Sequence, residues 1–208
     1  MTKGAIFDIQ CFENDLLIAT GEGGLVIVDL DNRVVKKKFA ISEKSARVLA
    51  VNPLAKEVAI GFSDHAIRVF SLPDYKLKYE FVAHKNSVFT LNYTNDYKFL
   101  ISGSRDARLK AWQVDAAYKQ AGEVAAHLFA INHIAFSPSG EYFATASMDK
   151  SIKIWKADEL KLLKVIDKGR HAGHGTSVNK LVWTDFNNQL VSASDDRTIS
   201  VWDLTFNS

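Results

Sequence analysis

Three histidines in this chain each stand 28 residues before a tryptophan, and this fixed spacing constrains the fold more than any other feature. An aspartate lies six residues before each of these tryptophans, and a serine or threonine lies four residues before each aspartate. The three sets are His84–Ser102–Asp106–Trp112, His127–Thr145–Asp149–Trp155 and His174–Ser192–Asp196–Trp202. Agreement at four positions in three copies indicates an internal repeat, so one structural unit is used several times along the chain.

Two weaker copies precede these three. In the second copy, Phe70 takes the tryptophan position, Asp64 keeps the aspartate and Ser42 replaces the histidine. In the first copy, Val28 and Glu22 take the tryptophan and aspartate positions. The tryptophan positions of the five copies are separated by 42, 42, 43 and 47 residues, so the period extends over the whole chain.

Each copy contains four short apolar segments separated by turn residues. In the fourth copy the segments are 131–136, 142–146, 152–155 and 162–167. Segments of about six residues that are rich in β-branched and aromatic residues, and bounded by Ser, Pro, Gly or Asp, are typical of antiparallel strands. Helical periodicity is not sustained anywhere. The sequence therefore predicts an all-β protein made of four-stranded units.

The repeated residues resemble those of the WD-repeat family, most closely at 136–155 (FSPSGEYFATASMDKSIKIW) and 190–204 (LVSASDDRTISVWDL). The resemblance implies a β-propeller with five four-stranded antiparallel blades, in a single domain over residues 1–208. The approximate blade bounds are 2–39, 42–82, 84–126, 127–168 and 174–208. The resemblance also implies that the histidine, the serine or threonine, the aspartate and the tryptophan of each set form a hydrogen-bonded chain within their blade. Because the first two copies lack the full set, we expect them to be the less stable part.

The last blade is expected to lack its fourth strand. The sequence ends just after the third segment of the fifth copy, and Thr2 takes the histidine position of the first copy. The chain thus resembles the C-terminal five blades of a seven-bladed propeller, and a ring of five closed blades is the alternative. An unpaired strand edge is a template for strand addition. Self-association through the terminal blades is therefore expected.

In WD-repeat proteins, the face that carries the histidine loops and the turn aspartates commonly receives peptides or partner domains. Nine residues are predicted to lie on this face: Ser63, His65, Lys85, Arg105, Phe129, Met148, Arg170, His171 and Asp195. Their mixture of cationic, apolar and acidic groups suits a protein ligand. The predicted function is a non-catalytic scaffold that binds a protein or peptide partner on this loop face.

The alternative function is a propeller enzyme or a metal-binding protein that uses the channel mouth. Only Asp8 and His133 lie on the segments predicted to line the channel, and they belong to copies three units apart. His171 and His174 form a His-x-x-His pair, but no cysteine or carboxylate nearby completes a metal site. The GxSxG and HExxH motifs and a phosphate-binding glycine loop are all missing from the sequence. We therefore predict no catalytic residues, no metal site and no cofactor.

Composition restricts the partners further. A formal net charge of +2 is too small to indicate a nucleic-acid or acidic-membrane partner. The three lysines at 36–38 alternate sides of a strand and cannot form one basic patch. The sequence has no charged-then-apolar leader and no apolar run of about 18 residues. The single cysteine, Cys11, excludes an internal disulfide and fits a reducing compartment. A cytoplasmic protein is therefore predicted.

Overall fold

A computed structural model describes residues 4–206, and this part of the chain forms five antiparallel sheets. In each sheet, strands that are consecutive in the sequence pair in order. The strands of the first three sheets are β1 (Ile6–Phe12), β2 (Asp15–Thr20), β3 (Gly24–Asp29), β4 (Val34–Ala40), β5 (Ala46–Asn52), β6 (Glu57–Phe62), β7 (Ala66–Ser71), β8 (Leu77–Val82), β9 (Val88–Tyr93), β10 (Phe99–Ser104), β11 (Arg108–Gln113) and β12 (Lys119–Ala125). The last two sheets contain β13 (Ile131–Phe136), β14 (Tyr142–Ser147), β15 (Ile152–Lys156), β16 (Lys161–Ile166), β17 (Val178–Trp183), β18 (Leu190–Ser194) and β19 (Ile199–Trp202).

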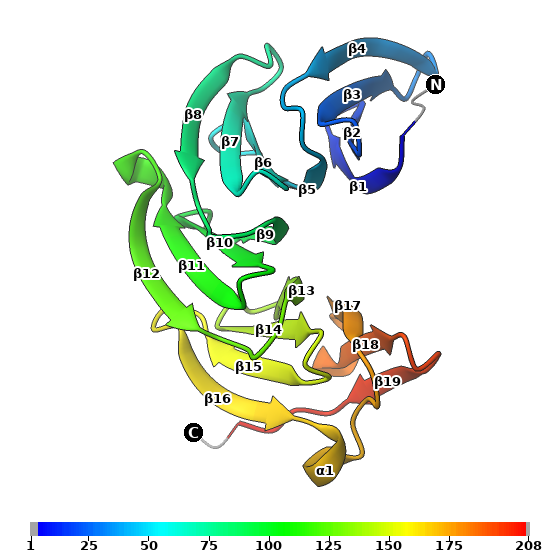
Figure 1. The fold of residues 1–208 in the computed structure, drawn as a ribbon, viewed down its shortest axis with the longest axis vertical. Coiled ribbons are helices and arrows are strands. Elements are labelled where there is room, and N and C mark those ends of the chain that lie inside the picture. The colour runs from blue at the N-terminus through cyan, green and yellow to red at the C-terminus, as the bar shows by residue number, and fades with distance from the viewer. Residues whose placement is uncertain (1–3, 207–208) are drawn as a thin grey trace.

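The five sheets are arranged as an arc, with the first strand of each sheet nearest the centre (Figure 1). Strand β1 lies beside β5, β5 beside β9, β9 beside β13, and β13 beside β17. Within residues 4–206 the arc does not close, because the first and last sheets are not neighbours (Figure 1). Four sheets have four strands and the last has three. The predicted all-β propeller with five blades and a three-stranded last blade is therefore confirmed.

The hydrophobic core lies between successive blades. Leu17 of the first blade packs with Leu49 and Ile60 of the second in one buried cluster. A matching cluster between the third and fourth blades contains Ile101 and Ile131. A middle blade has a neighbour on each side, so both faces of its strands are buried, and every residue of β6 is buried. This explains why the strands read as almost continuously apolar segments.

The two blades at the ends of the arc each leave one apolar face uncovered. On the first blade, Ile9 is 55% exposed and Val35 is 49% exposed. On the last blade, Val182, Ile199 and Val201 are exposed. The residues that alternate with them along β17 and β19 point to the other side of the sheet, toward the fourth blade. Strand β19 pairs only with β18 among the described residues. The last blade therefore has both an open edge and an open face.

Adjacent blades also meet at the end of the arc opposite the histidine loops. There, a residue just after the third strand of one blade contacts the first residue of the second strand in the preceding blade. The Tyr75 hydroxyl donates to Asp15 at 3.2 Å, and the Tyr118 hydroxyl donates to Glu57 at 2.7 Å. The remaining two junctions are apolar or aromatic, with Phe99 and Leu160 in one cluster and with Tyr142 stacked on Phe206 at 4.0 Å. These junctions were not predicted from the sequence, because they join side chains about 60 to 64 residues apart.

The turn between the second and third strands requires the same left-handed backbone in every copy. The residue after the turn aspartate has φ between 64° and 74° in the second to fifth blades, at His65, Ala107, Lys150 and Arg197. In the first blade this position is Gly23, with φ of 76°. A Cβ atom on Gly23 would lie 1.9 Å from the carbonyl oxygen of Ser42, so only glycine fits there.

Helices are short in the described part of the chain. They are the 3-10 turns Val114–Ala116 and Phe186–Asn188 and the four-residue helix α1 (Lys168–His171). The side chain of Asp167 caps α1 by accepting the backbone N–H of Arg170 at 2.9 Å. None of these helices has the length and apolar character needed to cross a membrane.

Candidate functional site

The residues of the fourth-blade set form a continuous hydrogen-bonded chain. The indole N–H of Trp155 donates to the Thr145 hydroxyl at 2.9 Å, and this hydroxyl lies 2.7 Å from Nε2 of His127. Nδ1 of His127 lies 2.8 Å from the Asp149 carboxylate. All of these side chains except Asp149 belong to buried residues. The four residues thus connect the loop before the first strand to the second and third strands.

The direction of the protons in this chain follows from the chemistry of its ends. Because the Asp149 carboxylate can only accept, Nδ1 of His127 carries the proton that it donates. Burial lowers the pKa of His127, so the imidazole is neutral at pH 7 and its Nε2 accepts from Thr145. Burial opposes ionisation of Asp149, but hydrogen bonds from His127, Ser151 and the Leu128 backbone hold its pKa below the ordinary value. Every polar group in the set is therefore occupied by another member.

The third and fifth blades repeat these contacts at almost the same distances. The imidazole Nε2 lies 2.7 Å from the serine hydroxyl in both blades, and the indole N–H donates to that hydroxyl at 2.9 and 2.8 Å. The imidazole Nδ1 lies 3.1 Å from the aspartate in both. The residues are His84, Ser102, Asp106 and Trp112 in the third blade, and His174, Ser192, Asp196 and Trp202 in the fifth. The structure thus brings the members of all three sets together.

The second blade lacks the histidine and the tryptophan and replaces their contacts differently. The hydroxyl of Ser42 donates to Asp64 at 2.8 Å, and Arg68 pairs with the same carboxylate at 2.8 Å. Ile60 stands where the other blades have the hydroxyl residue, and it is fully buried. Apolar packing therefore takes the place of the inner part of the hydrogen-bonded chain in this blade.

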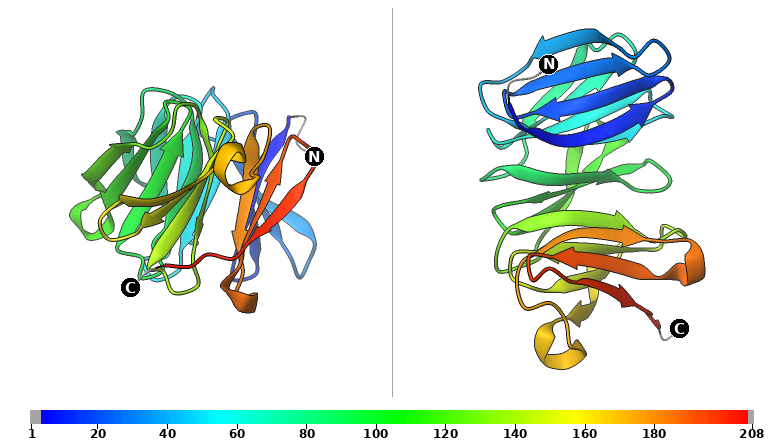
Figure 2. Two further views of the ribbon diagram at one scale, coloured as in Figure 1. Left: turned by 90° about the horizontal axis from the view of Figure 1, so that it is seen from below. Right: turned by 90° about the vertical axis from the view of Figure 1, so that its right-hand side faces the viewer.

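Most of the predicted partner-binding residues lie at one end of the arc, which Figure 2 shows from the side. In four blades, the backbone N–H of a turn residue donates to a carbonyl in the loop before the first strand, at 2.9 to 3.1 Å. These turn residues are Ser63, Arg105, Met148 and Asp195. His65 belongs to the same turn as Ser63, while Lys85 and Phe129 lie in the loops that these turns contact. We call this end the loop end.

Arg170 and His171 occupy a different place. They lie on α1, which projects at the outer rim of the arc away from the central strands (Figure 1). The other histidine of the His-x-x-His pair, His174, is buried in the fifth-blade set. Among residues 4–206, no three His, Cys, Asp or Glu side chains lie close enough together to hold a metal ion.

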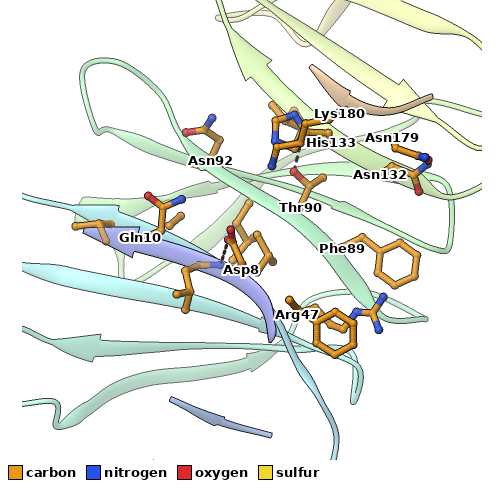
Figure 3. A pocket seen from close by; sticks show the side chains of 17 residues that line it. Asp8, Gln10, Arg47, Phe89, Thr90, Asn92, Asn132, His133, Asn179 and Lys180 are labelled. Atoms are coloured by element: carbon orange, nitrogen blue, oxygen red, sulfur yellow. Dashed lines mark hydrogen bonds between the residues drawn. The ribbon is translucent and has the colours of Figure 1, made fainter. Parts of the chain in front are cut away.

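A cavity of about 380 Å³ lies at the centre of the arc and is lined by the innermost strands (Figure 3). Asp8 and His133 both line it, although they come from blades three units apart. Each accepts a backbone N–H of the next blade: Asp8 from Leu49 at 2.8 Å and His133 Nδ1 from Leu181 at 3.3 Å. Thr90 stands at the same position in the third blade and accepts from Ile134 at 3.1 Å. These side chains therefore connect neighbouring blades.

The protonation of the two channel residues fits this connecting role. Burial raises the pKa of Asp8, although the N–H donors of Leu49 and Ile9 oppose the shift. Burial, with a smaller contribution from the charge of Lys180, lowers the pKa of His133 to about 3. His133 is therefore neutral at pH 7 and able to accept from the backbone, rather than poised to exchange a proton near neutral pH.

The loop end of the channel is surrounded by five residues that sequence analysis did not select. Each lies at the register shift of a first strand, at the position that immediately precedes Asp8, Thr90 and His133 in their blades: Phe7, Arg47, Phe89, Asn132 and Asn179. The Arg47 guanidinium lies over the Phe7 ring at 4.1 Å and over the Phe89 ring at 4.8 Å. Figure 3 labels Arg47 and Phe89 beside the cavity. Their common position in the five copies is the sequence signal that could have identified them.

Comparison with known proteins agrees with this geometry. The family model described as "WD domain, G-beta repeat" matches residues 75–113, 118–156 and 165–203, which together are more than half of the chain. The chain belongs to the WD40 family. The first two matched WD40 segments begin just before the outermost strand of one blade and the third begins near the end of that strand, and each segment ends at or just after the third strand of the next blade.

Several WD40 proteins resemble this chain over most of its length. WD repeat-containing protein 1 of Rattus norvegicus is 29% identical over 91% of the chain, which corresponds to 32% of the rat protein. Actin-interacting protein 1-2 of Arabidopsis thaliana is 27% identical over 92% of the chain and 30% of its own length. A WDS homolog from the same plant is 27% identical over 87% of the chain and 34% of its own length. The chain therefore spans about a third of the length of these relatives.

Proposed function

We propose that this WD40 chain is a non-catalytic interaction platform, and that a protein partner docks on the loop end of the arc. The observation that carries the proposal is the group of apolar side chains in the loops of the fourth blade, where Leu128 is 82%, Phe129 61% and Met148 53% exposed. Exposed apolar groups that lie together, with polar residues around them, are typical of protein-binding surfaces. In contrast, the histidines of the three sets have partners within their own blades.

Actin is the partner that we propose to test first. One relative carries the name actin-interacting protein 1-2, and its similarity to this chain extends over 92% of the chain. Because the chain spans only about a third of that relative, the docking surface here would be one part of a larger contact. A cytoplasmic location goes with this proposal.

The experiment is co-sedimentation of the purified protein with filamentous actin. The variant Phe129→Ala/Met148→Ala removes two exposed apolar groups from the loop end and is expected to weaken binding at least about tenfold. Leu54→Ala is the matched control, because Leu54 is 76% exposed in the turn between β5 and β6, at the opposite end of the blade. Equal retention of actin binding by both variants would contradict docking on the loop end.

Self-association through the terminal blades is a second part of this proposal. The open edge of β19 and the exposed side chains of Ile199 and Val201 offer a surface to a second copy of the chain. Size-exclusion chromatography with light scattering tests this directly. A dimer that becomes a monomer in Ile199→Lys would support it, and a monomer at all concentrations would contradict it.

A further inference from the structure

We propose that Arg47 is the anchor of a carboxylate-binding site at the loop end of the central channel, so that the partner presents an acidic residue there. This inference rests on the proposed function and specifies the chemistry of the partner. It follows from three observations on Arg47: its position at a register shift, its fixed guanidinium and its missing counter-ion.

The backbone aims Arg47 toward the channel mouth. Strand β5 has a register shift between Ala46 and Val48, so Arg47 is the extra residue that the pairing with β6 leaves out. Such irregularities re-aim a side chain and are common beside functional sites. Phe7 and Phe89 lie at the matching register shifts of β1 and β9, one blade to either side. Three neighbouring blades therefore converge on one guanidinium.

The two phenyl rings hold the guanidinium but leave its donors free. Rings at 4.1 and 4.8 Å restrain its rotation through cation–π contacts. Within residues 4–206, the side chain of Arg47 makes no hydrogen bond, and none of its nitrogen atoms is both buried and without a partner. Its N–H groups therefore face solvent at the mouth. A planar, restrained guanidinium with free donors is organised in advance for two parallel hydrogen bonds to a carboxylate.

Arg47 also lacks the counter-ion that comparable arginines have. Arg68 pairs with Asp64 at 2.8 Å and Arg108 pairs with Glu123 at 2.8 Å, but no carboxylate in the described chain pairs with Arg47. Burial, and then the nearby charge of Arg105, lower the pKa of Arg47. A half-buried cation beside a second cation is unfavourable without an anion, so a bound carboxylate would remove an existing repulsion.

The surroundings favour an acidic peptide over a cationic one. Lys44, Lys85 and Arg105 are exposed at the loop end of the second and third blades. The two turn aspartates there are already engaged, Asp64 with Arg68 and Asp106 with His84. Asp106 and the exposed Glu43 still carry negative charge, but Arg47, Lys44, Lys85 and Arg105 outnumber them, so the net local charge is positive. The exposed apolar loops of the fourth blade lie beside this region and suit a peptide in which an acidic residue is followed by apolar ones.

The test is a titration of the purified protein with fluorescein-labelled decaglutamate, followed by fluorescence anisotropy, with decaglutamine as the neutral probe. We expect decaglutamate to bind and decaglutamine not to bind. Arg47→Met keeps an unbranched side chain between the two rings but removes the charge, and it is expected to weaken decaglutamate binding about tenfold or more. Arg33→Gln is the matched control, because this exposed arginine lies in the β3–β4 turn at the opposite end.

Two further measurements keep the outcome clear. Thermal unfolding of Arg47→Met shows whether the variant is folded. In the wild-type protein, the side-chain Nε–Hε resonance of Arg47 is expected to move with decaglutamate and to stay in place with decaglutamine. Absence of decaglutamate binding, an unmoved resonance, or equal weakening in Arg47→Met and Arg33→Gln would each overturn the proposal. Actin co-sedimentation is a separate measurement. If the protein does not bind actin but Arg47→Met still weakens decaglutamate binding, only the choice of actin as the partner is overturned.

Discussion

The hydrogen-bonded set of the fourth blade makes a quantitative prediction for Thr145→Val. Valine has almost the same shape as threonine, so the substitution removes the hydroxyl without opening a cavity. It leaves two buried groups without partners, the indole N–H of Trp155 and Nε2 of His127, which now contact the hydroxyl at 2.9 and 2.7 Å. Each unsatisfied buried group costs about 1–3 kcal/mol, so the free energy of unfolding should fall by about 2–6 kcal/mol.

The assay is urea unfolding followed by circular dichroism. The variants are compared only if the slope of the unfolding free energy against urea concentration is unchanged. Thr176→Val is the control, because Thr176 is exposed, and its effect should stay within about 0.5 kcal/mol. In the double variant Thr145→Val/Trp155→Phe the indole N–H no longer needs a partner. The double variant should therefore lose less than the sum of the single variants, by about 1–3 kcal/mol. A Thr145→Val protein within 0.5 kcal/mol of wild type would refute the reasoning.

Three other perturbations test separate parts of the structure. The pKa of His133 is about 3 in the folded protein, against its ordinary value of about 6.5. As the pH falls from 7 to 5, the imidazole therefore takes up a proton in the unfolded chain but not in the folded protein, and the free energy of unfolding should fall by about 2 kcal/mol. His133→Asn should reduce this fall in urea titrations at the two pH values. Gly23→Ala should lower the thermal midpoint, at a cost of at least about 1–2 kcal/mol, because a left-handed φ of 76° strains alanine and its Cβ atom would lie 1.9 Å from the carbonyl oxygen of Ser42. Tyr118→Phe should destabilise the protein by about 1–3 kcal/mol, because Oε2 of Glu57 and the buried Tyr93 hydroxyl both lose their partner, whereas Tyr97→Phe should have little effect.

The repeated polar sets and the channel mouth use similar residue types for opposite purposes. In the sets, each donor meets an acceptor of the same blade, and the result is a rigid frame. At the mouth, Arg47 has donors with no acceptor in the described chain, and the frame holds it in place. A histidine that recurs from repeat to repeat in this chain is therefore a poor indicator of a binding site, and an unpaired side chain at a register shift is a better one.

The sequence by itself determined the parts of this protein that lie within one repeat. The spacing from His127 to Trp155 identified the four-residue set, and the strands, the turns and the three-stranded last blade followed from the same period. These features depend on residues less than 30 positions apart, whose relation is visible as a recurring interval. Arg170 and His171 show the limit, since the longer linker forms a short helix that carries them to the outer rim.

Only the tertiary structure decided which side chains of different blades meet. The contacts of Arg47 with Phe7 and Phe89, and of Glu57 with Tyr118, join residues about 40 to 60 positions apart. They depend on the angle between neighbouring sheets and on one extra residue in each first strand. Neither quantity changes the repeat period, because a register shift at the same place in every copy leaves the spacing between copies the same. The frame could therefore be read from the sequence, whereas the carboxylate-binding site that we propose required the assembled blades.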